Sequence, residues 1–219
     1  MADGLDDSPI LQEIADLATE LRVPIRHVRR DELFAEARTE SPQGVIAHAR
    51  ELPEAEFDDL LLPQRGRPPF LLAVDGITDP QNLGTLLRSA ECAGVTGVIL
   101  PRHRSVHVTP AVTKAAAGAV ERIPMTLVGG LPAALAYAKE HGAWVIGLDP
   151  DGETSLYETS HLASGPLVVV VGAEGTGMSR LVSQRCDVVA SIPLRGTLAS
   201  LNAAAAGAVA LFELGRHRP

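Results

Sequence analysis

The chain has 219 residues, enough for one large domain or for one domain with a smaller one beside it. Its net charge of −8 at neutral pH excludes nucleic-acid binding by bulk positive charge, so any such contact must use a local group of basic residues. No apolar run is long enough to cross a bilayer, and the acidic start MADGLDDSP lacks the apolar core of a signal peptide. We therefore expect a cytoplasmic protein.

The charge divides the chain into two parts. Residues 1–66 hold 7 Arg against 15 acidic residues, a net of −8, whereas residues 67–219 hold 12 basic and 12 acidic residues, a net of zero. The stretch ELPEAEFDDLLLPQRGRPP, residues 51–69, is acidic and then rich in proline and arginine, as linkers are. We predict one domain over 1–66, including this linker, and a second over 67–219. Cys92 and Cys186 lie far apart without an export signal, which predicts buried free thiols.

The first domain is predicted to contain two helices and two strands. Apolar residues recur with a helical period over 10–21, and RRDELFAEAR predicts a second helix over 29–38. Short strands are predicted over 23–28 and 42–51.

The second domain alternates apolar strands with helices. Predicted strands are 70–74, 95–100, 125–128, 144–148, 167–171 and 188–192, and predicted helices are 83–93, 110–120, 131–141, 179–184 and 198–214. Continuous apolar strands between helices indicate an α/β fold with a parallel sheet covered on both faces. Ligands in such sheets bind beyond the carboxyl ends of the strands, which directs attention to the loops after residues 74, 128, 171 and 192.

Three polar stretches follow predicted strands. In DPQNLGTLLRSAE, Asp79 or Asn82 can cap a helix whose leucines share one face, and Arg88 points away from that face. In VVVVGAEGTGMSR, Glu174 lies among glycines whose spacing differs from the dinucleotide-binding fingerprint, which disfavours a nicotinamide-dependent oxidoreductase. In IPLRGTLASLN, Ser200 or Asn202 can cap the last helix. Taken singly, each stretch is also compatible with a capped helix or a solvent-facing loop.

Metal chemistry finds no support in the sequence. His103 and His107 lie in RHRSVHV without acidic or cysteine neighbours at metal-ligand spacing, so we interpret this stretch as a surface loop.

Taken in order, the motifs resemble those of the SpoU-type ribose 2′-O-methyltransferases of the SPOUT class, which methylate rRNA or tRNA. The resemblance covers residues 70–214. It rests on Asp79-Pro80-Gln81-Asn82-Leu83-Gly84 followed by Arg88, on Gly172 to Gly177, on Ile192-Pro193 through Ser200-Leu201-Asn202, and on Lys114, Gly118 and Ala119. Ala116 and Ala173 depart from the pattern, because many relatives carry Ser and Asn there. Residues 1–66 resemble only the later part of the family's small RNA-binding domain.

The resemblance implies a fold, a cofactor and a set of site residues. The fold is a parallel-sheet SPOUT domain with a C-terminal trefoil knot, preceded by a small, shortened α/β RNA-binding domain. The cofactor is S-adenosylmethionine, held by backbone around Gly172, Gly177, Ile192 and Leu201. Arg88 handles the reacting hydroxyl, either as a base or as a charged stabiliser of the alkoxide; we favour the second because guanidinium stays protonated. Glu174 and Asn202 would orient Arg88, and Asn82 and Ser200 would hold ribose or phosphate.

The resemblance also implies partners. We expect a homodimer without a metal that methylates RNA, with 23S rRNA favoured. The alternatives are a tRNA ribose 2′-O-methyltransferase and a non-catalytic RNA-binding or ribosome-assembly protein with the same fold.

Overall fold

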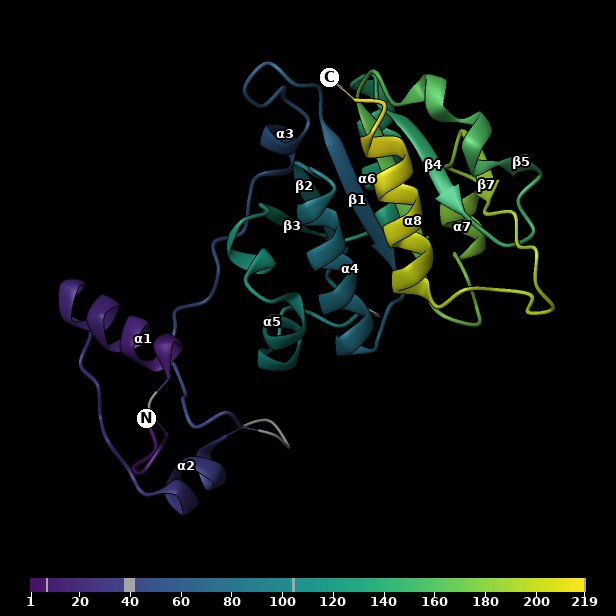
Figure 1. Ribbon diagram of the computed structural model, residues 1–219. Helices are drawn as coiled ribbons and strands as arrows, with labels where there is room; N and C mark the ends of the chain where they lie inside the picture. The colour runs from purple at the N-terminus through teal and green to yellow at the C-terminus, as the bar shows by residue number, and fades with distance from the viewer. Residues whose placement is uncertain (7, 38–41, 104, 219) are drawn as a thin grey trace. The chain divides into compact units, whose positions relative to one another are not determined.

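The computed structural model of the protein describes residues 1–6, 8–37, 42–103 and 105–218. The chain divides by its internal contacts into two units, Met1–Glu51 and Leu52–Pro219, each with its own helices (Figure 1). The division falls after Glu51, the first residue of the stretch that the sequence predicts to be a linker.

The first unit contains two helices, as predicted. Helix α1 (Pro9–Glu20) begins at Ser8, whose side chain accepts a hydrogen bond from the backbone of Leu11. Helix α2 (Arg30–Glu36) places Leu33 in the interior. Arg38, the last residue of the predicted second helix, lies outside the described residues.

The prediction of two strands in this unit is wrong. Only a single bridge, between Ala2 and Val28, forms in the first of these segments, and residues 42–51 contain no strand. Pro24 lies inside the first segment and has no N–H to donate to a ladder. In the second segment, Gly44 adopts a positive φ of 84°, which interrupts extended backbone.

The second unit is built on a seven-stranded sheet in which every neighbouring pair is parallel. Its order is β3-β2-β1-β6-β4-β7-β5. The strands are β1 (Phe70–Asp75), β2 (Gly97–Pro101), β3 (Met125–Val128), β4 (Trp144–Leu148), β5 (Thr154–Ser155), β6 (Leu167–Gly172) and β7 (Val188–Ser191). This confirms the predicted parallel sheet and its six longer strands. The sequence missed β5 because two polar residues carry no periodic pattern.

Helices cover both faces of the sheet, as predicted. One face is covered by α4 (Pro80–Cys92), α5 (Pro110–Ala116) and α8 (Ala203–Gly215), and the other by α3 (Phe57–Leu60), α6 (Leu131–Glu140) and α7 (Arg180–Ser183). In β1, Leu72 faces the first layer and Leu71 the second, because successive strand residues point to opposite faces. Short 3₁₀ helices at Ala119–Glu121, Leu156–Glu158 and Ser160–Leu162 complete the unit. No helix among the described residues is long and apolar enough to span a membrane.

The stretch predicted to be a linker contributes to this core. Leu60 of α3 is 1% exposed and packs with the second layer. The backbone N–H of Ala55 donates to Met125, and the Glu54 carboxylate accepts from the backbone of Leu127. Residues 52–60 therefore fold with the second unit.

Arg218, which follows α8, connects the end of that helix to the residues before β1 and β6 through hydrogen bonds. Its guanidinium donates four hydrogen bonds, to the carbonyl oxygens of Ala163 and Gly165 and of Pro68 and Pro69. It also stacks 4.7 Å from the ring centre of Phe70. Burial lowers the pKa of this guanidinium to about 10, so it stays charged at neutral pH.

We expect Arg218→Met to lower the free energy of unfolding by about 2–4 kcal/mol, because four carbonyl oxygens lose a charged donor. Urea denaturation measures the change. Arg216→Met is the matched control, since Arg216 pairs with Glu213 at the surface and its loss should change little. Equal midpoints for the two variants would contradict the anchoring role.

The two cysteines are free, as predicted, but they differ in exposure. Cys92 is exposed, which corrects the prediction that both are buried. Its position near the end of α4 lies on the helix's solvent face, opposite the leucines. Cys186 is partly buried, and burial followed by the negative charge of Asp187 raises the pKa of its thiol to about 12.

We expect one thiol per chain, Cys92, to react with a thiol reagent in the native protein at pH 8, and both to react after unfolding.

The raised pKa of Cys186 also makes the stability of the protein depend on pH. Above pH 9 an unfolded Cys186 loses its proton while the folded thiol keeps it, so stability decreases as pH rises from 9 toward 12. Denaturation midpoints at pH 8 and 10 should therefore differ more in the wild type than in Cys186→Ser. Rapid labelling of Cys186 would contradict this description.

Candidate functional site

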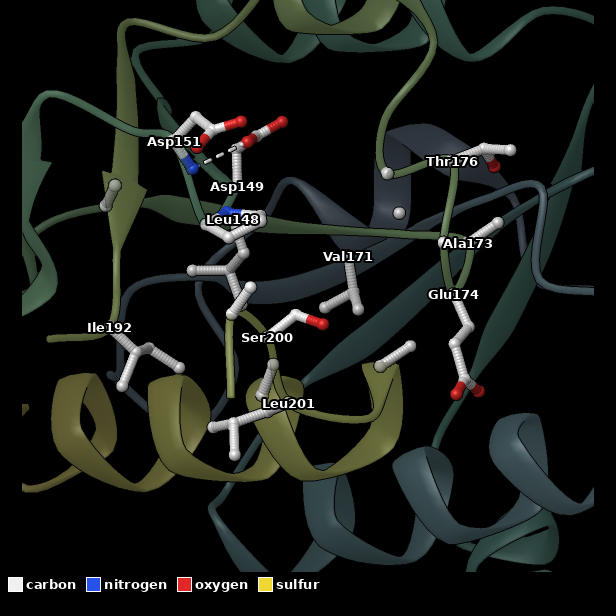
Figure 2. A pocket seen from close by; sticks show the side chains of 18 of the residues that line it. Leu148, Asp149, Asp151, Val171, Ala173, Glu174, Thr176, Ile192, Ser200 and Leu201 are labelled. Carbon is white, nitrogen blue, oxygen red and sulfur yellow. Dashed lines mark hydrogen bonds between the residues drawn. The ribbon is translucent and has the colours of Figure 1, made fainter. Parts of the chain in front are cut away.

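A pocket of about 380 Å³ lies beyond the carboxyl ends of β6, β4 and β7 (Figure 2). Residues 148–151 end β4 and begin its loop, and residues 171–177 end β6 and form its loop. Residues 192–201 after β7 close the pocket together with the start of α8. The four residues predicted to hold a cofactor, Gly172, Gly177, Ile192 and Leu201, all line it, as do Glu174 and Ser200. Of the four loops to which the carboxyl-end rule directs attention, those after residues 171 and 192 line the pocket. The loop after 128 lies at the far end of the sheet, and neither it nor the loop after 74 contributes a described lining residue.

The glycines after β6 form a tight turn against the end of their own strand. Ala173 and Gly177 exchange two backbone hydrogen bonds, of 3.1 and 2.9 Å. A Cβ atom on Gly172 would lie 2.3 Å from the carbonyl carbon of Gly177 and 2.4 Å from the nitrogen of Met178. Since these are backbone atoms, the turn can fold back only if residue 172 is glycine.

Three predicted residues from distant parts of the chain form one hydrogen-bonded cluster. The Asn202 amide donates to Asn82 Oδ1 at 2.8 Å and to Glu174 Oε2 at 3.1 Å. The Asn82 amide donates to the same Glu174 oxygen at 3.1 Å. The cluster joins the first turn of α4, the loop after β6 and the start of α8.

The three residues of the cluster differ in how many of their hydrogen-bonding groups are used within the protein. Asn202 is fully used, since both N–H groups donate within the cluster and Oδ1 caps α8 by accepting from Ala204 and Ala205. Asn202 therefore caps α8, as one of the two interpretations of the sequence expects, and its role as a site residue stays a prediction. Within the described part of the chain, Glu174 Oε1 and one N–H of Asn82 have no partner. These two groups can meet a ligand.

Arg88 lies on the solvent face of α4, as the helical pattern predicts, with Leu83, Leu86 and Leu87 buried opposite. It is six residues beyond Asn82, roughly 9 Å along the helix axis. It forms no hydrogen bond or ion pair with the described residues, so Glu174 and Asn202 hold Asn82 rather than Arg88 in this structure. Asp79, not Asn82, caps α4 by accepting from the backbone of Gln81.

The Lys114, Gly118 and Ala119 element lies outside the pocket. Lys114 is on α5, which packs against α4. Ala117 and Gly118 adopt positive φ angles of 49° and 91°, so the helix predicted to reach residue 120 ends at Ala116. This element supports α4 from the side. Among the residues that the structure describes, His, Cys, Asp and Glu side chains form no group of three suited to a metal.

Asp149 is a charged pocket residue that the sequence reasoning missed. It directly follows β4, and Asp151 donates its backbone N–H to Asp149 Oδ1 at 2.9 Å. The signal was available, because the carboxyl-end rule applies equally to the loop after residue 148. The predicted site does not include that loop.

Comparison with known proteins decides the family. Residues 69–212 match the model of the SpoU rRNA Methylase family, and residues 2–55 match the model for RNA 2′-O ribose methyltransferase substrate binding. The chain belongs to the SpoU rRNA methylase family. Membership confirms the predicted resemblance, and the second match covers most of the first unit.

Curated SpoU relatives are similar over the full chain. The 23S rRNA (guanosine-2′-O-)-methyltransferase RlmB of Pseudomonas syringae pv. tomato is 41% identical over 221 residues, covering 100% of this chain and 86% of the relative. The protein of the same name from Yersinia pestis is 39% identical over 216 residues, covering 98% of this chain and 87% of the relative.

Solved methyltransferase structures share the fold. The methyltransferase AviRb from Streptomyces viridochromogenes, in complex with AdoMet, has a TM-score of 0.77 at 24% identity and covers 97% of this chain and 79% of that one. An AdoMet-bound rRNA methyltransferase from Sinorhizobium meliloti has a TM-score of 0.77 at 24% identity, with coverage of 95% and 78%.

Proposed function

We propose that this SpoU family member transfers a methyl group from S-adenosylmethionine to the ribose 2′-hydroxyl of a guanosine in 23S rRNA. The observation that carries the proposal is the Asn82–Glu174–Asn202 cluster beside the pocket. Three separate motifs converge there, and curated relatives named for this activity are about 40% identical along the whole chain.

The pocket suits S-adenosylmethionine. Its volume of about 380 Å³ lies within the usual range for small-molecule sites. Leu148, Val171, Ile192 and Leu201 provide apolar walls for an adenine ring. No Lys, Arg or His is among the described lining residues, whereas Asp149, Asp151 and Glu174 are, which favours a ligand with positive charge.

When bound, S-adenosylmethionine supplies a methyl group on a positively charged sulfur, and thus a good leaving group. In the transfer, the methyl carbon–sulfur bond breaks, a carbon–oxygen bond forms, and the proton of the 2′-hydroxyl leaves to RNA phosphate or water. The protein must position the hydroxyl and stabilise its developing negative charge. Glu174 Oε1 and the free N–H of Asn82 are placed to hold the ribose, and Ser200 also lines the pocket.

Arg88 supplies the positive charge in this proposal. Its guanidinium stays protonated, so it stabilises the alkoxide electrostatically instead of accepting the proton. Because it faces solvent without a partner among the described residues, incoming RNA can reach it. Asn202 is a positioning residue, since its hydrogen-bonding groups are all used within the protein.

We extend the proposal to the knot, the first unit and the assembly. After β7 the chain runs past the loop that follows β6, where Asn202 donates a hydrogen bond to Glu174. It then forms α8, which packs on α4. This path of the chain supports a C-terminal trefoil knot. Residues 1–66 serve as an RNA-binding domain with its linker. Three exposed apolar side chains on α8 and the loop before it lie outside the pocket lining and support a homodimer: Leu198, Val209 and Phe212. We also propose a cytoplasmic location.

Methyl transfer from labelled S-adenosylmethionine to separate pools of unmodified 23S rRNA, 16S rRNA and tRNA tests the substrate class. The proposal predicts label in 23S rRNA alone. Label in tRNA alone would favour the tRNA alternative, and cofactor binding without label in any pool would favour a non-catalytic RNA-binding protein.

A further inference from the structure

We infer that Asp149 binds the ribose hydroxyls of the bound cofactor and so sets the pocket's requirement for a ribonucleoside. The inference rests on the proposed assignment of this pocket to S-adenosylmethionine. Asp149 is half-buried at the pocket wall, directly after the last residue of β4.

The two carboxylate oxygens of Asp149 have different surroundings. Oδ1 accepts the backbone N–H of Asp151, which fixes the orientation of the carboxylate (dashed line in Figure 2). Oδ2 faces the glycine loop, where a Cβ atom on Gly177 would lie 3.5 Å away. Among the described residues, Oδ2 forms no hydrogen bond or ion pair, and Asp149 lines the pocket together with Gly177. The free oxygen is therefore an oriented acceptor, which is what a sugar hydroxyl needs.

The position in the sheet favours sugar recognition. β4 is the direct neighbour of β6, whose loop carries the glycines. In nucleotide-binding α/β sheets, an acidic residue near the end of a strand beside the glycine-rich loop accepts hydrogen bonds from ribose. Here the acidic residue precedes the glycine loop in the chain instead of following it, so a search downstream of the glycines does not find it.

The placement of Asp149 relative to the proposed reaction end favours the nucleoside part of the cofactor, and not the sulfonium, as the group that Asp149 binds. Asp149 and Glu174 lie on opposite sides of the pocket in Figure 2. The reacting sulfur must lie near the Asn82–Glu174–Asn202 cluster, where the target ribose is held. The nucleoside part of the cofactor then lies nearer Asp149.

Isothermal titration calorimetry with four ligands tests the inference. The ligands are S-adenosylhomocysteine, its 2′-deoxy and 3′-deoxy analogues, and 5′-methylthioadenosine, which keeps both hydroxyls but lacks the amino acid group. In the wild type, removal of at least one hydroxyl should weaken binding about 10-fold or more, because a hydrogen bond to a charged group is lost.

Two variants complete the test. Asp149→Asn keeps an acceptor for Asp151, and Asp149→Ala removes the whole carboxylate. Both should weaken S-adenosylhomocysteine and 5′-methylthioadenosine by similar factors, and in Asp149→Ala the deoxy analogues should bind as well as the parent ligand. Glu153→Gln, a nearby exposed carboxylate outside the pocket lining, should bind like the wild type.

Three results would overturn the inference. The first is that the wild type binds the parent and deoxy ligands with equal affinity. The second is that Asp149→Ala weakens the binding of all four ligands equally. The third is that the Asp149 variants weaken S-adenosylhomocysteine but not 5′-methylthioadenosine, which would assign Asp149 to the ammonium group. Failure of the wild type to bind any of the ligands would instead contradict the proposed function.

Discussion

Arg88→Ala is expected to lower kcat for methyl transfer about 10²–10³-fold while leaving the affinity for S-adenosylmethionine within about two-fold of the wild type. The loss follows from removing the positive charge that stabilises the alkoxide. The affinity is retained because Arg88 lies on the solvent face of α4 and does not line the pocket. Single-turnover methylation and calorimetry measure the two quantities separately.

Arg122→Ala is the matched control, since Arg122 is also exposed and follows a helix on the same side of the sheet. Arg88→Lys keeps the charge without the planar donor geometry, so its activity should lie between those of the wild type and Arg88→Ala. Near-normal turnover in Arg88→Ala with cofactor bound would show that Arg88 does not serve the reaction.

Gly172→Ala is expected to lower the free energy of unfolding by about 2–3 kcal/mol, which corresponds to a fall of about 4–12 °C in Tm. The added methyl group would overlap the backbone of Gly177 and Met178, which cannot turn aside as a side chain can. The loop must open, so the pocket loses its shape and cofactor affinity should fall more than 10-fold. Thermal unfolding with and without S-adenosylhomocysteine measures both effects.

Gly129→Ala controls for the loss of a glycine as such, because a Cβ atom there meets nothing within 4 Å and its φ is not positive. Its unfolding temperature should change little. A Gly172→Ala protein with unchanged Tm and unchanged ligand stabilisation would mean that the turn does not depend on close packing.

The fold of the second unit could be predicted because its strands carry a strong signal. β3 and β4 begin and end where the apolar runs do, since strands buried on both faces read as continuous apolar segments. The prediction of strands over 23–28 and 42–51 is wrong because these apolar segments have no neighbouring strand with which to form a ladder of hydrogen bonds. Pairing partners are a property of tertiary structure, which a local pattern does not contain.

The candidate site could be predicted in part. Asn82, Glu174 and Asn202 were nominated by the family resemblance, since each is equally compatible with a cap or a loop by itself. Their hydrogen bonds link residues up to 120 positions apart, a relation that no local pattern reveals. The expected contact of Glu174 and Asn202 with Arg88 is absent here because the helical rotation between positions 82 and 88 points Arg88 to solvent. Cofactor contacts at Gly172, Gly177, Ile192 and Leu201 stay predictions.

The most direct test of the proposed function is the identity of the methylated nucleoside. Unmodified 23S rRNA would be incubated with S-adenosylmethionine and either the wild-type protein or Arg88→Ala, digested to nucleosides, and analysed by mass spectrometry. The account predicts 2′-O-methylguanosine with the wild-type protein and almost none with Arg88→Ala. A methyl group on a base, on another nucleoside, or in equal amount with both proteins would contradict it.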